Sequence, residues 1–488
     1  MTFSSRERIV AGVSLAAAVL SAGCSDNYLN VTNPNSIPIA AAGSDPNALA
    51  QQATGLMVDW RGTRAGYITS TGIFGREAYN FTLSEPRNTT AYLIGIGAGQ
   101  NKLDPGGFAN GIWGGEYSGL RDIFNFKLAV AAASTTLVPA TQKQAAIGFA
   151  ETMEAALLLH VIATRDTLGA VVQTNPDPAD LAPFVSRDSA YRYILATLAD
   201  ASAQLNAGAT AFPFALHSGF KTGATDFTKP ATFAKLTNGL LARAAAYYAT
   251  EGGSAASWQT ALTALQASFI NTTASGLTRA GLDDGVYQVY SASTGDSQNG
   301  LNFVNNTNLY AHMSIQTDVQ KKADGTNDNR YTAKIRTAPF RVAPGGAAAA
   351  SSLGFSIWSA ATSPIAEMRN EELILLRSEA KLATGDKAGA IADLELVRSS
   401  SGGLPPTGLT AATAAGDILT ALLYEKRMSL LMEGHRWIDM RRYGRLGQLP
   451  IDITSGPQQN FVAVVMPVPQ AECLLRAGKA APYAGPGC

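Results

Sequence analysis

The chain has 488 residues, with 37 basic and 37 acidic side chains that give a formal net charge of zero. This balance argues against nucleic acid as a partner, because a protein needs a basic surface to displace the counterions of phosphates. Hydrophobic residues make up 46% of the chain, and its 47 Gly and 22 Pro follow no period, which excludes collagen and wholesale disorder.

The first 23 residues have the pattern of an export signal. Arg6 and Arg8 precede an apolar run over residues 9–20, and small residues then lead to Cys24. We expect cleavage before Cys24 and a lipid on its sulfur, which anchors a protein to a membrane without spanning it. An ordinary signal peptide is the alternative, since Ser21 stands where lipoprotein signals usually carry Leu.

Cys24 is followed by Ser25 rather than by the Asp that commonly marks inner-membrane retention, so the outer membrane is favoured. Residues 24–44 are polar and rich in Pro and Asn, which predicts a tether with little to bury. The remaining residues, 45–488, are expected to form the folded domain.

Apolar residues spaced three and four positions apart predict helix pairs at about 141–207, 231–271 and 365–398. Ser186 is expected to cap the helix that follows it. Residues 243–250 and 377–384 both read R-x-x-A-x-x-A-T, and small side chains at this spacing let helices approach closely. This repetition predicts tetratricopeptide-like hairpins, which bury their apolar faces by stacking.

Long stretches without helical spacing separate these pairs, at residues 61–108, 213–230, 278–362 and 402–408. Loops of this length inside a compact fold are usually functional. We therefore expect an all-α (mainly α) fold, in which the hairpins pack with a long, irregular, loop-rich ligand-binding region.

The cysteines fit an exported protein. Apart from Cys24 there are Cys473 and Cys488, both in a Pro- and Gly-rich tail. In an oxidising compartment we expect this pair to form a disulfide, and two free thiols are the alternative.

Few residues point to enzyme or metal chemistry. The four His form no H-E-x-x-H pattern and lie near no Cys pair, and no G-x-S-x-G elbow occurs. Asp283 and Asp284 would make an unusual glycosidase pair, because adjacent carboxylates rarely face one another across a bond, so a solvated turn is favoured. We expect no catalytic residues, no metal site and no cofactor.

The stretch over residues 424–448, YEKRMSLLMEGHRWIDMRRYGRLGQ, closely resembles the C-terminal signature of the SusD/RagB family. Weaker likenesses extend from Cys24 to Glu472 and include the PIAEMR segment at residues 364–369. Charges and an aromatic ring near a helix end usually make ion pairs and packing contacts. A structural role is therefore predicted for three residues of the signature: Glu433, Arg436 and Trp437.

The resemblance implies a lipid-anchored outer-membrane protein that faces the cell exterior. Proteins of this family capture oligosaccharides or other nutrients and deliver them to a SusC-like TonB-dependent transporter. The same role for peptide or another organic nutrient is one alternative. A tetratricopeptide scaffold that binds only proteins is another, because fold alone does not decide function.

Aromatic residues are the candidates for ligand binding, because sugar rings stack on aromatic faces while their hydroxyls need polar partners. The family places no such aromatics at motif positions. The candidates are therefore tyrosines of irregular segments with polar neighbours: Tyr79 beside Arg76 and Asn80, Tyr92, Tyr287, Tyr290 and Tyr310. For each the alternative is a buried ring that anchors its loop. Helix aromatics, such as Tyr191, Tyr193 and Tyr247, are expected to be core.

Overall fold

The structure is a computed structural model that describes residues 45–97, 99–304, 306–346 and 349–488. The predicted signal peptide, Cys24 and the tether over residues 24–44 lie outside the described residues.

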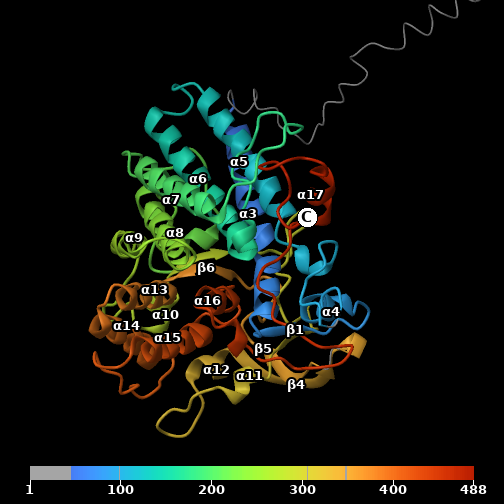
Figure 1. Cartoon of the computed structure of the whole chain (residues 1–488). Coiled ribbons are helices and arrows are strands. Elements are labelled where there is room, and N and C mark those ends of the chain that lie inside the picture. The colour runs from blue at the N-terminus through green and yellow to red at the C-terminus, as the bar shows by residue number, and fades with distance from the viewer. Residues whose placement is uncertain (1–44, 98, 305, 347–348) are drawn as a thin grey trace, which may run out of the picture.

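Helices dominate the architecture, which confirms the predicted mainly α fold (Figure 1). The longer helices are α3 (Pro46–Phe74), α5 (Gly114–Ala132), α6 (Ala140–Arg165), α7 (Arg187–Leu205), α8 (Pro230–Thr250), α9 (Ala255–Gln266), α13 (Asn370–Ala383), α14 (Lys387–Ser400) and α15 (Ala415–Ser429). The shorter ones are α4 (Arg87–Leu93), α10 (Arg279–Leu282), α11 (Ser314–Thr317), α12 (Asn329–Lys334), α16 (Arg436–Arg442) and α17 (Gln470–Leu475).

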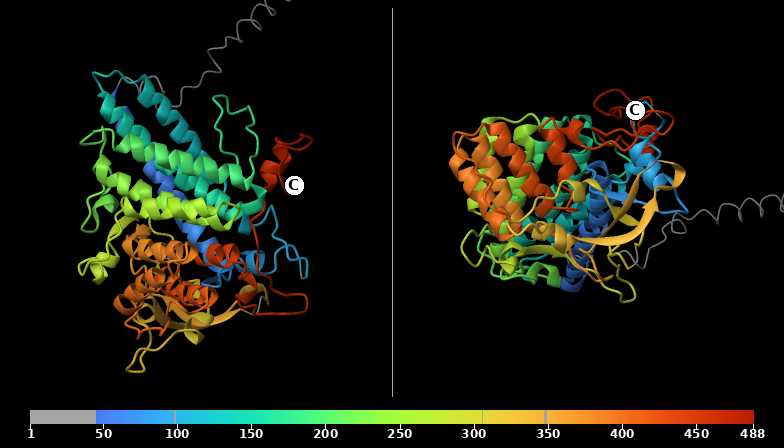
Figure 2. Two further views of the ribbon diagram at one scale, coloured as in Figure 1. Left: turned by 60° about the vertical axis from the view of Figure 1, so that its left-hand side comes forward. Right: turned by 90° about the horizontal axis from the view of Figure 1, so that it is seen from below.

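The three expected helix pairs are α6 with α7, α8 with α9, and α13 with α14. Neighbouring helices pack in chain order from α5 to α9, and α13 packs on α9, so the pairs form one continuous stack (Figures 1 and 2). Ser186 caps α7 as predicted, since its side-chain oxygen accepts a hydrogen bond from the amide of Ser189. The tetratricopeptide character of the pairs stays a prediction.

Helix α6 is the apolar centre of this stack. Within the described residues, the stretch Ala140–Leu168 is long and apolar enough to cross a membrane, but 94% of its most apolar window is buried inside the body. Its apolar character therefore serves the core of the folded domain.

Residues 61–74 were expected to be irregular, and this expectation is wrong. They form the second half of α3, although Gly62, Gly66 and Gly72 lower the helix propensity of this segment. Packing overrides propensity here, because most side chains from Tyr67 to Phe74 are buried. At Gly72 a Cβ atom would lie 2.7 Å from the sulfur of Met432, so a larger residue here would require the Met432 side chain to shift.

A buried charge ties α3 to the last third of the chain. The Arg64 guanidinium donates to the backbone oxygen of Ala366 at 2.8 Å and to that of Glu433 at 3.2 Å. It also lies 3.6 Å from the carboxylate of Glu367. Since Arg64 is almost fully buried, these partners replace the water that its charge loses.

The expected helix over residues 365–384 begins later than predicted. Residues 365–369 form strand β6 (Ile365–Arg369), and α13 starts at Asn370. Strand β6 pairs antiparallel with β2 (Gly285–Gln288), a partner that local spacing does not reveal. Pro364 also disfavours helical geometry in the residue before it.

The rest of the predicted irregular region contains a small sheet at the lower end of the body in Figure 1. Its strand order is β1 (Ala78–Asn80), β3 (Leu309–Ala311), β5 (Ala350–Phe355) and β4 (Ile335–Val342), and all neighbours pair antiparallel. Segments more than 200 residues apart thus meet in one sheet, as the pairing of Ala78 with Ala311 shows.

Candidate functional site

The residues of the family signature lie in the interior. Glu433 accepts hydrogen bonds from the Arg369 guanidinium, with the closest contact at 2.5 Å, and lies 3.7 Å from the ammonium group of Lys334. Trp437 is fully buried, and its indole N–H donates to the backbone oxygen of Ala463 at 2.7 Å. These contacts connect the segment before α16 to β6, and α16 itself to the C-terminal segment.

Arg436 has a different environment. Burial lowers the pKa of its guanidinium to about 9, and the neighbouring charge of Arg427 contributes to this fall. The carboxyl of Glu77, close to it, opposes the fall, while burial raises the pKa of Glu77 itself to about 7. The Nε of Arg436 has no hydrogen-bond partner among the described residues, so the structural role of this residue stays a prediction.

Three of the five candidate tyrosines are enclosed by the body. Tyr79, Tyr92 and Tyr310 are only 2%, 7% and 4% exposed. The hydroxyl of Tyr79 donates to Asp452 at 2.9 Å, and that of Tyr92 donates to the backbone oxygen of Phe108 at 3.1 Å. Their position corrects the prediction that they line a ligand site, because rings packed on all sides offer no face to a sugar.

The polar neighbours of Tyr79 are also engaged within the fold. Arg76 is fully buried, has a positive φ of 54°, and donates to the backbone oxygens of Ile73, Pro450 and Phe461. Asn80 is half-buried, and its side-chain oxygen accepts a hydrogen bond from Thr82. Arg76 therefore ties the loop after α3 to the C-terminal segment.

Tyr290 is half-buried at the edge of the body. The Arg61 guanidinium lies 5.6 Å from the centre of its ring, and burial raises the pKa of its hydroxyl to about 12. That hydroxyl has no hydrogen-bond partner within the described part of the chain. Its ring is thus held by Arg61 on one side.

Tyr287 differs from the other four because it lines a cavity of about 480 Å³. The walls come from β2, α10 and two polar loops, and the lining residues are Thr222, Gly223, Ala224, Asn271, Ser275, Thr278, Ala280, Gly281, Asp283, Asp284, Tyr287 and Pro364. We call this cavity the Tyr287 pocket. Sequence reasoning missed its Asn, Ser and Thr residues, because loop residues follow no spacing rule.

Tyr287 is held in place at the rim of this pocket. Its hydroxyl donates to the backbone oxygen of Asp283 at 2.6 Å, and burial raises the pKa of the hydroxyl, so it stays protonated. The ring itself is only half-buried. One fixed aromatic ring is therefore presented beside the polar groups of the pocket.

The two carboxylates of the pocket, Asp283 and Asp284, have different partners. Asp284 is buried and accepts hydrogen bonds from the amide and the hydroxyl of Thr225, at 3.0 and 2.6 Å. The side chain of Asp283 is 44% exposed and pairs with Arg279 at 2.6 Å and with Arg369 at 3.0 Å. Asp284 thus shapes the loop, while Asp283 joins α10 to β6 and leaves part of its side chain exposed to the solvent.

In residues 45–97, 99–304, 306–346 and 349–488, no group of three or more His, Cys, Asp or Glu side chains is arranged to hold a metal ion.

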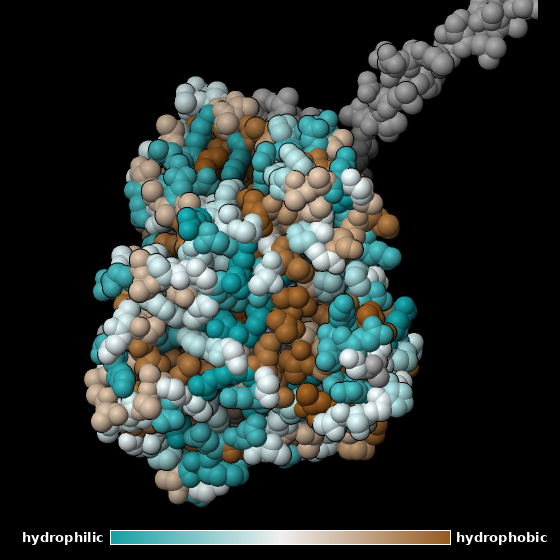
Figure 3. Space-filling view, in the orientation of Figure 1, coloured by the Kyte–Doolittle hydropathy of each residue, from teal (hydrophilic) through white to brown (hydrophobic). Residues whose placement is uncertain are grey.

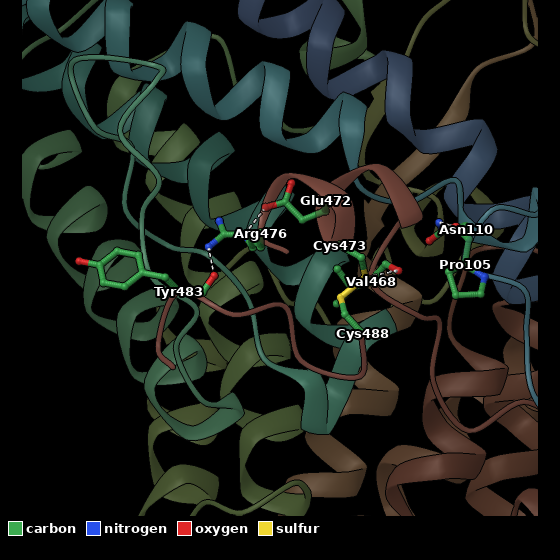
Figure 4. Close-up of a disulfide and its surroundings, with 8 residues drawn as sticks. All are labelled: Pro105, Asn110, Val468, Glu472, Cys473, Arg476, Tyr483 and Cys488. Carbon is green, nitrogen blue, oxygen red and sulfur yellow. Dashed lines mark hydrogen bonds and ion pairs between the residues drawn. A yellow bond between two sulfur atoms is a disulfide. The ribbon is translucent and has the colours of Figure 1, made fainter. Parts of the chain in front are cut away.

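The C-terminal tail is closed by a disulfide between Cys473 and Cys488, whose Cα atoms lie 5.5 Å apart (Figure 4). Arg476 lies inside this loop, donates to the backbone oxygen of Tyr483 at 3.0 Å and pairs with Glu472 (Figure 4). The tail is thus tied to itself and, through Arg476, to the backbone oxygen of Ala182 at 2.9 Å.

Comparison with known proteins identifies relatives of this fold. Residues 247–471 match the sequence model of the SusD family. A SusD-like protein from Bacteroides fragilis is similar at 15% identity and a TM-score of 0.63, over 89% of this chain and 96% of that chain. Surface glycan-binding protein A from Bacteroides thetaiotaomicron, in complex with laminarihexaose, is similar at 12% identity and a TM-score of 0.62.

The similarity to surface glycan-binding protein A covers 89% of this chain and 98% of that chain. NanU from B. fragilis is similar at 14% identity and a TM-score of 0.59, over 90% of this chain and 97% of that chain. At such identities the structural likeness establishes the fold alone. No curated protein matches the sequence.

Proposed function

Because this chain belongs to the SusD family through residues 247–471 and shares the SusD-like fold, we propose that it is a nutrient-binding lipoprotein of the cell surface. It captures an oligosaccharide and delivers it to a SusC-like TonB-dependent transporter of the outer membrane. A lipid on Cys24 holds it to that membrane. The laminarihexaose complex of one structural neighbour supports oligosaccharide as the ligand class.

The Tyr287 pocket carries this proposal. It combines a fixed, half-buried aromatic ring with the exposed carboxylate of Asp283 and with the amide and hydroxyl groups of Asn271, Ser275 and Thr278. The C–H face of a sugar stacks on such a ring, and its hydroxyls exchange hydrogen bonds with such neighbours. The function requires binding and release and no bond-making step.

Delivery to a transporter requires a protein-binding surface. Figure 3 shows apolar side chains gathered in a band on one face of the molecule. Exposed apolar residues of the C-terminal segment include Ile451 and Val464, which are 43% and 56% exposed. Exposed apolar surface of this kind is typical of docking sites, and this supports a protein partner.

Calorimetry with hexaoses of glucose, mannose and xylose, including laminarihexaose, tests the ligand class. We expect Tyr287→Ala to weaken binding about three- to tenfold, because the stacking face is lost. Tyr287→Phe is the matched control, since it keeps the ring and removes only the hydrogen bond to Asp283. Unchanged melting of both variants shows that the fold is intact.

Other outcomes decide against the proposal. If peptides bind and hexaoses do not, the protein serves the same role for another nutrient. If no small ligand binds while the protein copurifies with a transporter, it is a scaffold for proteins. Equal hexaose binding by Tyr287→Ala and the wild type places the ligand outside the Tyr287 pocket.

A further inference from the structure

A second polar cavity lies far from the Tyr287 pocket. It has a volume of about 370 Å³ and is lined by residues of α5, α6, α7 and the loop between α6 and α7, among them Phe124, Lys127, Glu154, Gln173, Thr174 and Tyr193. An adjoining cavity of about 200 Å³ shares Gln173 and Thr174 with it and continues along α5 past Arg121 and Tyr117. We call the two together the α5 groove.

The groove follows one face of α5. Tyr117, Arg121, Phe124 and Lys127 succeed one another at spacings of three and four residues, so their side chains lie in one row. The row covers about 15 Å of helix at the rise of an α-helix. A groove of this shape accommodates an extended ligand better than a compact one.

Aromatic rings face this groove. Phe124 and Tyr193 are half-buried, although helix spacing predicted Tyr193 to be core. The Arg121 guanidinium lies 5.5 Å from the centre of the Phe124 ring, on the side of the adjoining cavity. The ring of Phe124 therefore has a fixed orientation beside the first cavity.

Fixed polar groups flank the rings. Lys127 and Glu154 form an ion pair at 2.9 Å, and Glu154 also accepts a hydrogen bond from the hydroxyl of Tyr193. On the opposite wall Gln173 donates to Asn175 at 2.6 Å. Ammonium, carboxylate, amide and phenol groups thus surround aromatic faces, which is the combination that a sugar with many hydroxyls requires.

The loop that forms this wall is held at its base. Ala170 and Val185 form a bridge, and the amide of Phe184 donates to the backbone oxygen of Pro482 at 2.8 Å. Arg476 of the disulfide-closed tail donates a hydrogen bond to the backbone oxygen of Ala182. The wall is thereby braced by the tail, so the groove is a preformed feature of the fold.

We propose that the α5 groove is a second oligosaccharide-binding site, and this inference rests on the proposed function. It binds a further stretch or a second molecule of the nutrient glycan, with Phe124 and Tyr193 as its aromatic faces and the Lys127–Glu154 pair as its hydrogen-bonding centre. Figure 1 shows α5, α6 and α7 in the upper part of the body and α10, beside the Tyr287 pocket, in the lower part. The two sites therefore lie in separate parts of the body.

The test uses the hexaose panel with calorimetry and hydroxyl-radical footprinting. We expect a bound hexaose to protect Phe124 and Tyr193 from oxidation, both in the wild type and in Tyr287→Ala. Adding Phe124→Ala to Tyr287→Ala should weaken the remaining binding about three- to tenfold. Asp122→Asn, a change at an exposed residue on another face of the same helix, should leave it unaltered.

The two proposals fail in different ways. If Tyr287→Ala alone abolishes hexaose binding and no hexaose protects Phe124 or Tyr193 in the wild type, the α5 groove is not a site, while the proposed function stands. If the wild type binds no hexaose, both proposals fall. Equal affinity of Tyr287→Ala with and without Phe124→Ala, together with absent protection, also overturns the groove.

Discussion

Glu116 makes the stability of this protein depend on pH in an unusual direction. Its side chain lies in the first turn of α5, is 1% exposed, and accepts no hydrogen bond from another described residue. Burial raises the pKa of this carboxyl from 4.5 to about 7, against the opposing effects of its own amide and the Arg165 guanidinium. His160, 4.0 Å away, offers no countercharge, since burial lowers its own pKa well below 6.5.

The size of the effect follows from this rise. Since each tenfold change in proton affinity is worth about 1.4 kcal/mol, charged Glu116 costs about 3 kcal/mol of folding free energy. The N-terminus of a helix stabilises a carboxylate by only about 0.3 to 1 kcal/mol, which is less than this cost. Between pH 4.5 and 7 the folded state keeps a proton on Glu116 that the unfolded state releases. The free energy of unfolding therefore decreases as the pH rises through this range.

Glu116→Gln keeps the size of the side chain and removes its charge. We expect the variant to match the wild type near pH 4.5 and to exceed it by about 3 kcal/mol at pH 8, in urea unfolding followed by circular dichroism. The difference between the two proteins isolates Glu116 from other groups that titrate.

Glu85→Gln is the control, because hydrogen bonding to Arg87 lowers the pKa of this exposed carboxyl. The free energy of unfolding of Glu85→Gln, relative to that of the wild type, should therefore fall as the pH rises, whereas that of Glu116→Gln should increase. A difference between Glu116→Gln and the wild type that stays constant from pH 4.5 to 8 would refute the reasoning.

Three further experiments test other parts of the structure. Cys24→Ala should move the protein from the detergent phase to the aqueous phase of a Triton X-114 partition, and a wild type already in the aqueous phase contradicts the lipid anchor. Alkylation without reduction should leave Cys473 and Cys488 unmodified in a mass measurement, whereas two labelled thiols exclude the disulfide. Trp437→Phe should lower the free energy of unfolding by about 1 to 3 kcal/mol, because the oxygen of Ala463 loses its buried donor, and an unchanged melting curve argues against that role.

The helical part of the fold was readable from the sequence because its information is local. The helix pairs have continuous apolar faces, and the Ser186 cap depends on a residue only three positions away. The signature around Glu433 and Trp437 is equally local, and its interior position fits the ion pairs and packing predicted for it.

The ligand site was much harder to predict from the sequence, because the exposure of a loop aromatic depends on partners that are distant in the chain. Tyr79 and Tyr287 have similar polar neighbours in the sequence. Tyr79 is enclosed by Asp452, a residue 373 positions away, whereas the hydroxyl of Tyr287 bonds to Asp283 only four positions away and leaves its ring at a pocket. Strand β6 escaped prediction for the same reason, since its partner is β2 rather than a neighbour in the chain.

The contacts of Arg64 have a consequence for the order of events in biogenesis. Its acceptor at Ala366 is made 302 positions later, which at about 5 to 20 residues per second means a wait of roughly 15 to 60 s. During that time α3 can form as a helix but cannot be buried, because the Arg64 guanidinium would lose its water without gaining a partner. The nascent N-terminal half should therefore remain exposed to proteases and chaperones until the last third of the chain arrives, and fragments that stop short of Ala366 should not fold.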